Sequence, residues 1–171
     1  MKKCNRLAVV FVVCLVVVFL LGQPSVATAQ TTTEQDPHVK LLERILAQTN
    51  NCLGVSKGEK NLMENGYSLR DSVRVYNTLL IQLIAESVSI EVEAAKIFNL
   101  TMSNSDLFIW MSCRMGTDAL VIHWAIQLQS SEKAALSLFK LSAVHVDVAN
   151  KALKAANDLI IPEFLLGGNT T

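Results

Sequence analysis

The side chains that could carry out acid–base or metal chemistry are few in this chain. Its three histidines are His38, His123 and His145. If the chain reverses near Ser130, the two later histidines differ in height by about 12 Å at ~1.5 Å per helical residue, so we do not expect a shared metal ion. Asp118 could approach His145, but an isolated helical pair is more often a structural contact than a catalytic one.

Sequence motifs of catalysis are also missing. The sequence contains no nucleophile elbow, no glycine-rich phosphate loop and no zinc-binding His-Glu-x-x-His segment. It therefore predicts neither an enzyme nor a cofactor or metal site.

The cysteines point to a different kind of chemistry. Cys4 and Cys14 lie in an N-terminal segment that we expect to be removed, which leaves Cys52 and Cys113 as the only pair. In an oxidising compartment two cysteines most simply form one disulfide, and two free buried thiols are the alternative. Closing a loop of about 60 residues would stabilise the fold by ~4 kcal/mol in the chain-entropy model.

Aromatic and methionine side chains offer a candidate binding surface. Trp110, Met111, Trp124 and Phe139 could line an apolar pocket, because aromatic rings and flexible methionines accommodate irregular ligands. Ordinary packing in a helical core is the alternative interpretation. The sequence predicts an apolar small molecule as one possible partner.

The N-terminal segment predicts the compartment. Basic residues at 2, 3 and 6 precede an apolar run from Leu7 to Leu21, and Ala27-Thr28-Ala29 then resembles a signal-peptidase site. The run would span about 22 Å as a helix, short of a ~30 Å hydrocarbon core. We therefore expect residues 1–29 to be a cleaved signal peptide, and the mature chain to be secreted with no stable membrane span.

Charge and sequons fit an extracellular protein. Removing three of the 15 basic residues leaves 12 against 15 acidic residues, a net charge of −3. Without a basic cluster, nucleic acid is not an expected partner. Asn99 and Asn169 each begin an Asn-x-Thr sequon and are predicted glycosylation sites.

Apolar periodicity predicts an all-α fold. The expected helices are a short one over residues 36–51 and long ones over residues 69–98, 105–129 and 131–160. Ser68 and Ser103 each begin a Ser-x-x-Asp capping sequence, and Asp36 precedes a proline at a helix start. Pro162 is expected to end the last helix. Ser130-Ser131 marks a reversal or a kink.

The segment between the first two helices is less regular. Residues 53–67 contain three glycines and are expected to form a loop with one helical turn. Short connections elsewhere favour an up-and-down bundle of three long helices and a shorter N-terminal helix, joined by one disulfide. The bundle domain would span residues 36–162, between a flexible arm at 30–35 and a tail at 163–171.

Unequal helix lengths suggest a function. A short first helix would leave one groove between the long helices half open, so the preferred hypothesis is a secreted protein that binds an apolar ligand or a protein partner through wide apolar faces. The alternatives are a cytokine-like secreted signalling protein and a structural homo-oligomer, including a homodimer.

Overall fold

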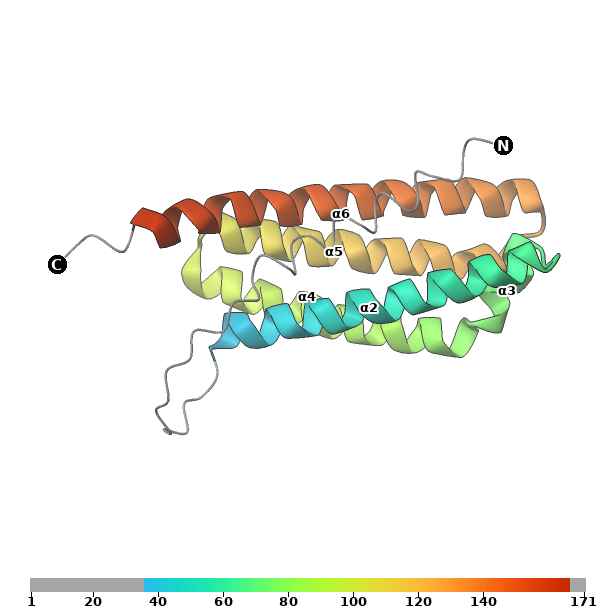
Figure 1. The fold of residues 1–171 in the computed structure, drawn as a ribbon, viewed down its shortest axis with the longest axis horizontal. Coiled ribbons are helices and arrows are strands. Elements are labelled where there is room, and N and C mark those ends of the chain that lie inside the picture. Colours follow the sequence, from blue (N-terminus) through green and yellow to red (C-terminus); the bar gives the residue numbers. More distant parts are fainter. Residues whose placement is uncertain (1–35, 167–171) are drawn as a thin grey trace.

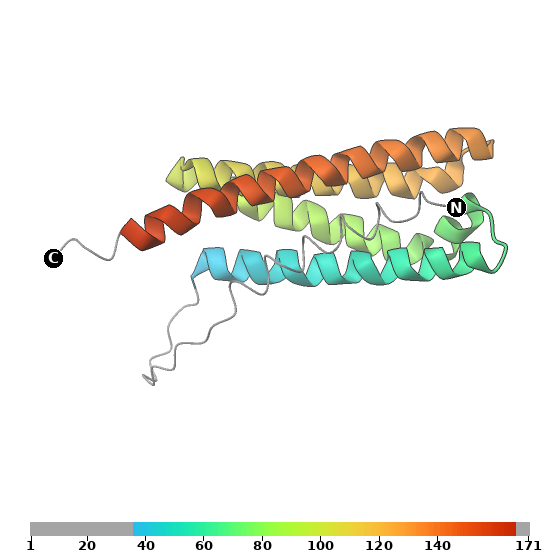
Figure 2. The ribbon, with the colours of Figure 1, turned by 45° about the horizontal axis from the view of Figure 1, so that its top comes forward.

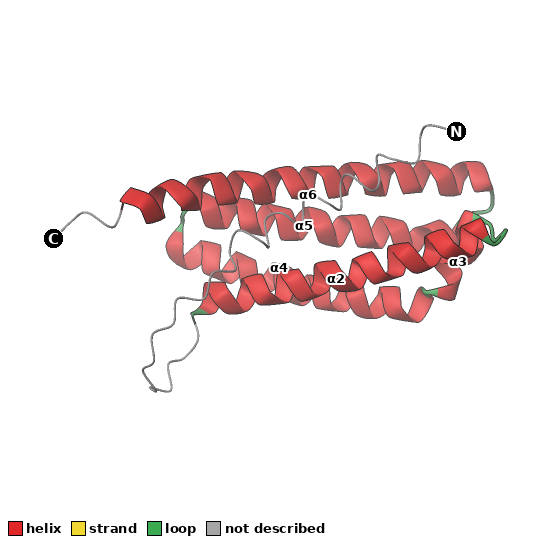
Figure 3. Ribbon diagram, viewed as in Figure 1, coloured by secondary structure: helices red, strands yellow, loops and turns green. Residues whose placement is uncertain are grey.

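The structure, a computed structural model, describes residues 36–166 and the side chains of residues 36–160. Within this range it is all-α, as predicted, with short connections between the helices (Figure 3). The predicted signal peptide, the arm, most of the tail and Asn169 lie outside the described residues. The helices are α2 (Pro37–Glu64), α3 (Leu69–Val75), α4 (Asn77–Thr101), α5 (Asn104–Trp124), the 3₁₀ helix η1 (Ala125–Leu128) and α6 (Glu132–Leu166).

Four long helices form an antiparallel bundle. In Figure 1, α2 and α5 run from left to right, and α4 and α6 run back. The same four helices stay side by side when the molecule is turned by 45° (Figure 2). Packing follows the chain: α2 lies on α4, α4 on α5, and α5 on α6. α3 packs against η1 and α6 at one end.

The first helix is not short, which corrects the prediction. α2 has 28 residues and continues through the segment expected to be a loop. Its beginning is as predicted, because Asp36 accepts a hydrogen bond from the His38 backbone N–H and Pro37 follows it. Gly58 lies inside the helix, and a Cβ at this position would overlap the Tyr76 side chain. The glycine therefore permits close packing of α2 against the turn at Tyr76 and does not break the helix.

The second predicted helix is divided at Tyr76. α3 begins at the predicted Ser68 cap, whose Oγ accepts from the Asp71 backbone N–H at 3.1 Å. Asn77 then opens α4, and its Oδ1 accepts hydrogen bonds from Trp124 and from Gln127, both at 2.8 Å. These contacts across the bundle hold the start of α4 against η1. Local sequence patterns do not contain such long-range information.

The start of α5 is as predicted, whereas the end of α6 differs from the prediction. Ser103 caps α5 through the Asp106 backbone N–H, as predicted. The chain reverses between η1 and α6, so Ser130-Ser131 belongs to a reversal and not a kink (Figure 1). α6 continues past Pro162 to Leu166, so the proline does not end the helix as predicted, although its ring removes one helical hydrogen bond.

The core is split into two clusters along the bundle. One, near the start of α2, is centred on Leu41, Ile90 and Ile97, and the other, near α3, on Val73, Leu80 and Ile126. Over residues 132–160, where the side chains of α6 are described, the buried residues are all small: Ala135, Ser142, Ala149, Ala152 and Ala156. Small side chains let α6 approach α5 closely, but they fill little volume.

Candidate functional site

A cavity of about 220 Å³ lies between the two core clusters. All four long helices contribute to its wall, and side chains of both clusters line it. Its apolar lining includes Ile45, Val55, Leu80, Leu83, Ile90, Leu120, Val146 and Leu153. An interior position between helices of a bundle is a common place for a small-molecule site.

The cavity exists because small residues face it. Gly116 and Ala119 of α5 and Ser142 and Ala149 of α6 lie on its wall. A Cβ added at Gly116 would meet no atom within 4 Å outside its own helical neighbourhood. Close packing therefore does not require a glycine at this position. A glycine in a helix interior also destabilises the helix by roughly 1 kcal/mol relative to alanine.

One side of the cavity is closed and another is more exposed. Every lining residue of α4 is buried, including Leu83 and Ser87. On α2 and α6, lining residues such as Thr49, Ser56 and Val146 are half-buried. Since α5 packs closely on both α4 and α6, we place the mouth of the cavity between α2 and α6.

Gln48 places a polar group in this wall. The residue is only 8% exposed, and its Nε2 donates to the Leu83 carbonyl oxygen at 2.6 Å and to Ser87 Oγ at 2.7 Å. A carbonyl oxygen can only accept, so the amide nitrogen must face Leu83. Gln48 Oε1 is then an oriented acceptor, and it receives no hydrogen bond from the protein.

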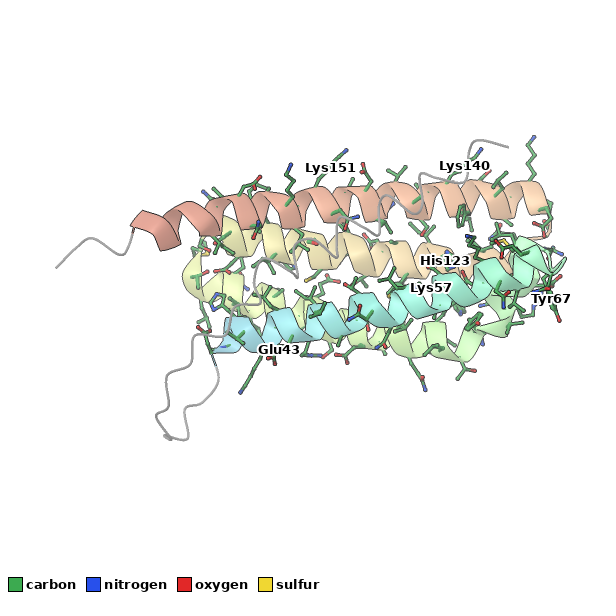
Figure 4. All side chains as sticks on the ribbon, viewed as in Figure 1. Glu43, Lys57, Tyr67, His123, Lys140 and Lys151 are labelled. Carbon is green, nitrogen blue, oxygen red and sulfur yellow. The ribbon has the colours of Figure 1, made fainter. Side chains whose placement is uncertain are left out.

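A buried acid–imidazole pair lies at the α3 end of the cavity. His123, which lines the cavity, places Nε2 at 2.9 and 3.1 Å from the two carboxylate oxygens of Glu59. Glu59 is 4% exposed, so the pair joins α2 to α5 in the interior. The His123 ring also packs at a tilt on Phe139. In Figure 4, by contrast, Lys140 and Lys151 extend from α6 away from the bundle.

The predicted disulfide is absent, which corrects that expectation. Cys52 and Cys113 are free, half-buried thiols on the cavity wall. They lie on α2 and α5, and α2 packs chiefly on α4 and α3. Burial raises the pKa of the Cys52 thiol to about 11. Burial and the nearby Glu91 carboxylate raise that of Cys113 to about 12.

The four predicted pocket residues do not line this cavity. Trp110 stacks on Phe98 with ring centroids 6.0 Å apart and packs against the Leu41 cluster. Trp124 and Phe139 pack against the other cluster, and Met111 is exposed. These aromatic side chains fill the two ends of the core, whereas smaller residues surround the cavity between them.

The other residues singled out from the sequence have structural partners or lie at the surface. His38 bridges Asp36 and Asp106 at 3.2 Å each, His145 bonds to the Leu141 carbonyl, and Asp118 pairs with Arg114. Asn99 is exposed in the last turn of α4. Among the described residues, no group of three metal-ligating side chains occurs. Nor does any described helix combine the length and apolarity that a bilayer span requires.

Sequence reasoning missed the residues that shape the site. Gly116 interrupts an otherwise good helix pattern and was the one available signal of a widened interior. The sequence contains no indication of the role of Gln48, because that role depends on which helix the side chain faces.

Comparisons of the chain with protein-family models, curated proteins and solved structures find no match.

Proposed function

We propose that this chain is a secreted binding protein that holds a small, mainly apolar molecule in the cavity between its four long helices. The observation that carries the proposal is the cavity wall itself, in which Gly116, Ala119 and Ala149 leave space that larger residues could fill. Secretion in this proposal is supported by the predicted signal peptide at residues 1–29. In this proposal the ligand enters between α2 and α6.

Stability favours an occupant for this space. An apolar molecule in this space would remove the mostly apolar lining from water, and the burial of apolar surface is favourable. A ligand that binds only the folded state stabilises that state. The mostly apolar lining selects an apolar body, and the few polar groups can fix its orientation.

Native mass spectrometry of the protein purified from the medium of secreting cells is the first test. We expect a mass above that of the mature chain, which is lost on denaturation. Calorimetric titration with 1-octanol is the second test, and it should give saturable binding to one site. A bare chain that binds neither 1-octanol nor other small apolar probes would contradict the proposal.

Two alanines on α6 provide matched variants. Ala149→Leu adds three carbons at the cavity wall and should abolish binding, whereas Ala143→Leu makes the same change at an exposed position of the same helix and should not. If both variants bind 1-octanol like the unmodified protein, the ligand does not occupy this cavity.

A homo-oligomer is the second candidate. Leu141, Val144 and Val148 are exposed and recur on one face of α6. Such a face can pair with its copy across a two-fold axis. Sedimentation equilibrium at increasing protein concentration tests it, since a dimer doubles the mass without any added ligand. Cytokine-like signalling stays a sequence-based hypothesis.

A further inference from the structure

The outer face of α4 carries an uncharged, largely apolar stripe that no part of the described chain covers. The residues of this α4 stripe follow one another by three or four positions and are Thr78, Ile81, Ala85, Val88, Val92 and Ala95. All but Ala95 are exposed, and Val88 and Val92 keep 45% and 48% of their surface. Because the buried residues of α4, such as Leu83 and Ile90, lie on the opposite face of the helix, the stripe points away from the bundle.

The acidic side chains of α4 are drawn sideways from this stripe. Arg44 of α2 binds Glu86 and Glu93. On the other side, Arg114 of α5 binds Glu91 at 3.0 Å. These three glutamates are all the acidic residues of α4, so the neighbouring helices hold every carboxylate of the helix and leave the α4 stripe without charge.

A stripe with this spacing fits a second helix. Apolar residues that alternate between steps of three and four form the seam along which two helices pack. We propose that a second copy of this chain covers the α4 stripe, with the two α4 helices antiparallel across a two-fold axis. A two-fold axis requires a surface that is complementary to itself.

The sizes of the side chains meet that requirement. With the axis between residues 86 and 87, Ala85 faces the partner's Val88. Ile81 then faces the partner's Val92, and Ala95 faces the partner's Thr78. No alanine faces another alanine in this arrangement. A parallel pair would set each alanine against its own copy and leave gaps between the larger layers, which close packing disfavours.

Other occupants and the other exposed face fit less well. A helix that lies on a membrane carries lysines and arginines beside its apolar face, whereas α4 has one basic residue against three acidic ones. On α6, Leu141, Val144 and Val148 have the same spacing, but the next step reaches Lys151. The α6 face is therefore a shorter seam than the α4 stripe.

The antiparallel dimer leaves the other predicted features accessible. Asn99, the predicted glycosylation site, lies beyond the start of the partner's α4, and its two copies are roughly 37 Å apart along the helices. The residues of α4 that line the cavity are on its buried face. The dimer is therefore independent of ligand binding in the cavity.

Sedimentation equilibrium of the protein purified from the medium of secreting cells tests the proposal. We expect twice the mass of the mature chain. Val88→Glu should raise the dissociation constant on the order of 100-fold, because it would bury two carboxylates close to the axis. Val144→Glu, the matched change on α6, should leave the constant unchanged within about twofold.

Both substitutions are at exposed positions, and circular dichroism checks that each variant keeps its helices. If Val88→Glu does not fold, Ala85→Arg takes its place at the same seam. A protein that stays monomeric at its highest soluble concentration overturns the proposal. A dimer that Val144→Glu disrupts and Val88→Glu does not also overturns it, because the interface is then on α6.

A disulfide test determines the direction of the two helices. Co-expressed Ile81→Cys and Val92→Cys chains should form a disulfide between the engineered cysteines, which peptide mapping distinguishes from Cys52 and Cys113. Neither variant should pair with its own copy, because the two sites would be roughly 16 Å apart, beyond the ~7 Å that a disulfide spans between Cα atoms. If Ile81→Cys alone forms a disulfide with its own copy, the helices are parallel and the antiparallel arrangement is overturned.

Discussion

The two outer helices of the bundle, α2 and α6, are held by different forces. α6 packs on α5 mainly through small residues such as Ala152 and Ala156, with one buried hydrogen bond from Ser142 Oγ to the Ala119 carbonyl. α2 buries Leu41 and Val55 in the core clusters, and it is tied to its neighbours by a larger set of directional polar bonds. Arg44 reaches Glu86, Ser89 and Glu93 of α4; Gln48 reaches Leu83 and Ser87; Glu59 reaches His123.

This difference explains where the cavity lies and which helix controls it. Alanine packing fixes α6 at a distance set by backbone contact, whereas polar ties hold α2 at particular points and leave space between them. Directional bonds break individually, so α2 is the helix that we expect to open first.

Removing the Glu59 carboxylate should have the largest effect on stability. Glu59→Ala leaves His123 without its buried partner, and we expect a loss of about 3 kcal/mol in the free energy of unfolding, measured with urea. Glu64→Ala, at an exposed position of the same helix, should change it by less than about 0.5 kcal/mol. Similar losses for the two variants would mean that the buried pair does not anchor α2.

Two alanine-to-leucine changes on α6 sharpen the comparison. Ala156 is 1% exposed and belongs to a packed cluster, so Ala156→Leu should cost about 2 kcal/mol through overpacking. Ala149→Leu extends into the cavity and should be neutral or stabilising. Thermal unfolding of both variants measures the contrast, and equal losses would show that the cavity cannot accept extra carbon.

The helix caps could be predicted from the sequence, because capping depends only on residues that are close together in the chain. Asp36, Ser68 and Ser103 were expected as caps and act as caps, because a side chain that bonds a nearby backbone N–H needs no information from elsewhere. The continuity of α2 and the break at Tyr76 were missed. Both depend on contacts between distant segments, namely Gly58 with Tyr76 and Asn77 with Trp124.

The candidate site was harder to predict for the same reason. Large aromatic residues suggested a pocket, but large residues fill space, and here they pack the two ends of the core. A cavity is made by residues that are too small, such as Gly116 and Ala149, and their effect appears only after four helices are assembled. The disulfide prediction was wrong, because it was inferred from the number of cysteines and the expected oxidising compartment and not from the distance between the two thiols.

The reactivity of Cys52 on α2 can be compared with that of Cys113 on α5. Their raised pKa values keep Cys52 and Cys113 protonated at pH 8, so each should react with iodoacetamide on the order of tenfold more slowly than an exposed cysteine, after allowing for the greater nucleophilicity of a basic thiolate. Peptide mass spectrometry over time measures the rates. A Cys52 that reacts at the exposed rate while Cys113 stays protected would indicate that α2 opens alone.

Acid should loosen the start of α2. Burial raises the pKa of Asp106, but hydrogen bonds from Thr101 and Ser103 and the His38 imidazole outweigh it and hold that pKa below its ordinary value. The stabilisation is therefore present above about pH 4 and is lost as pH falls through the lower, folded-state pKa. Asp106→Asn should cost about 1 kcal/mol at pH 7 and flatten the urea-measured stability below pH 4. An unchanged acid slope would contradict this.

The smallest expected change is a gain. Gly116→Ala adds one methyl group that meets open space, so the helix should gain roughly 0.5–1 kcal/mol of stability. Gly58→Ala is the matched change on α2, and it should destabilise because its Cβ would overlap Tyr76. Urea unfolding measures whether each substitution raises or lowers the free energy of unfolding. If the Gly116 gain comes with weaker binding of 1-octanol, stability and ligand space compete at this residue, and a gain with unchanged binding would show that the glycine does not shape the site.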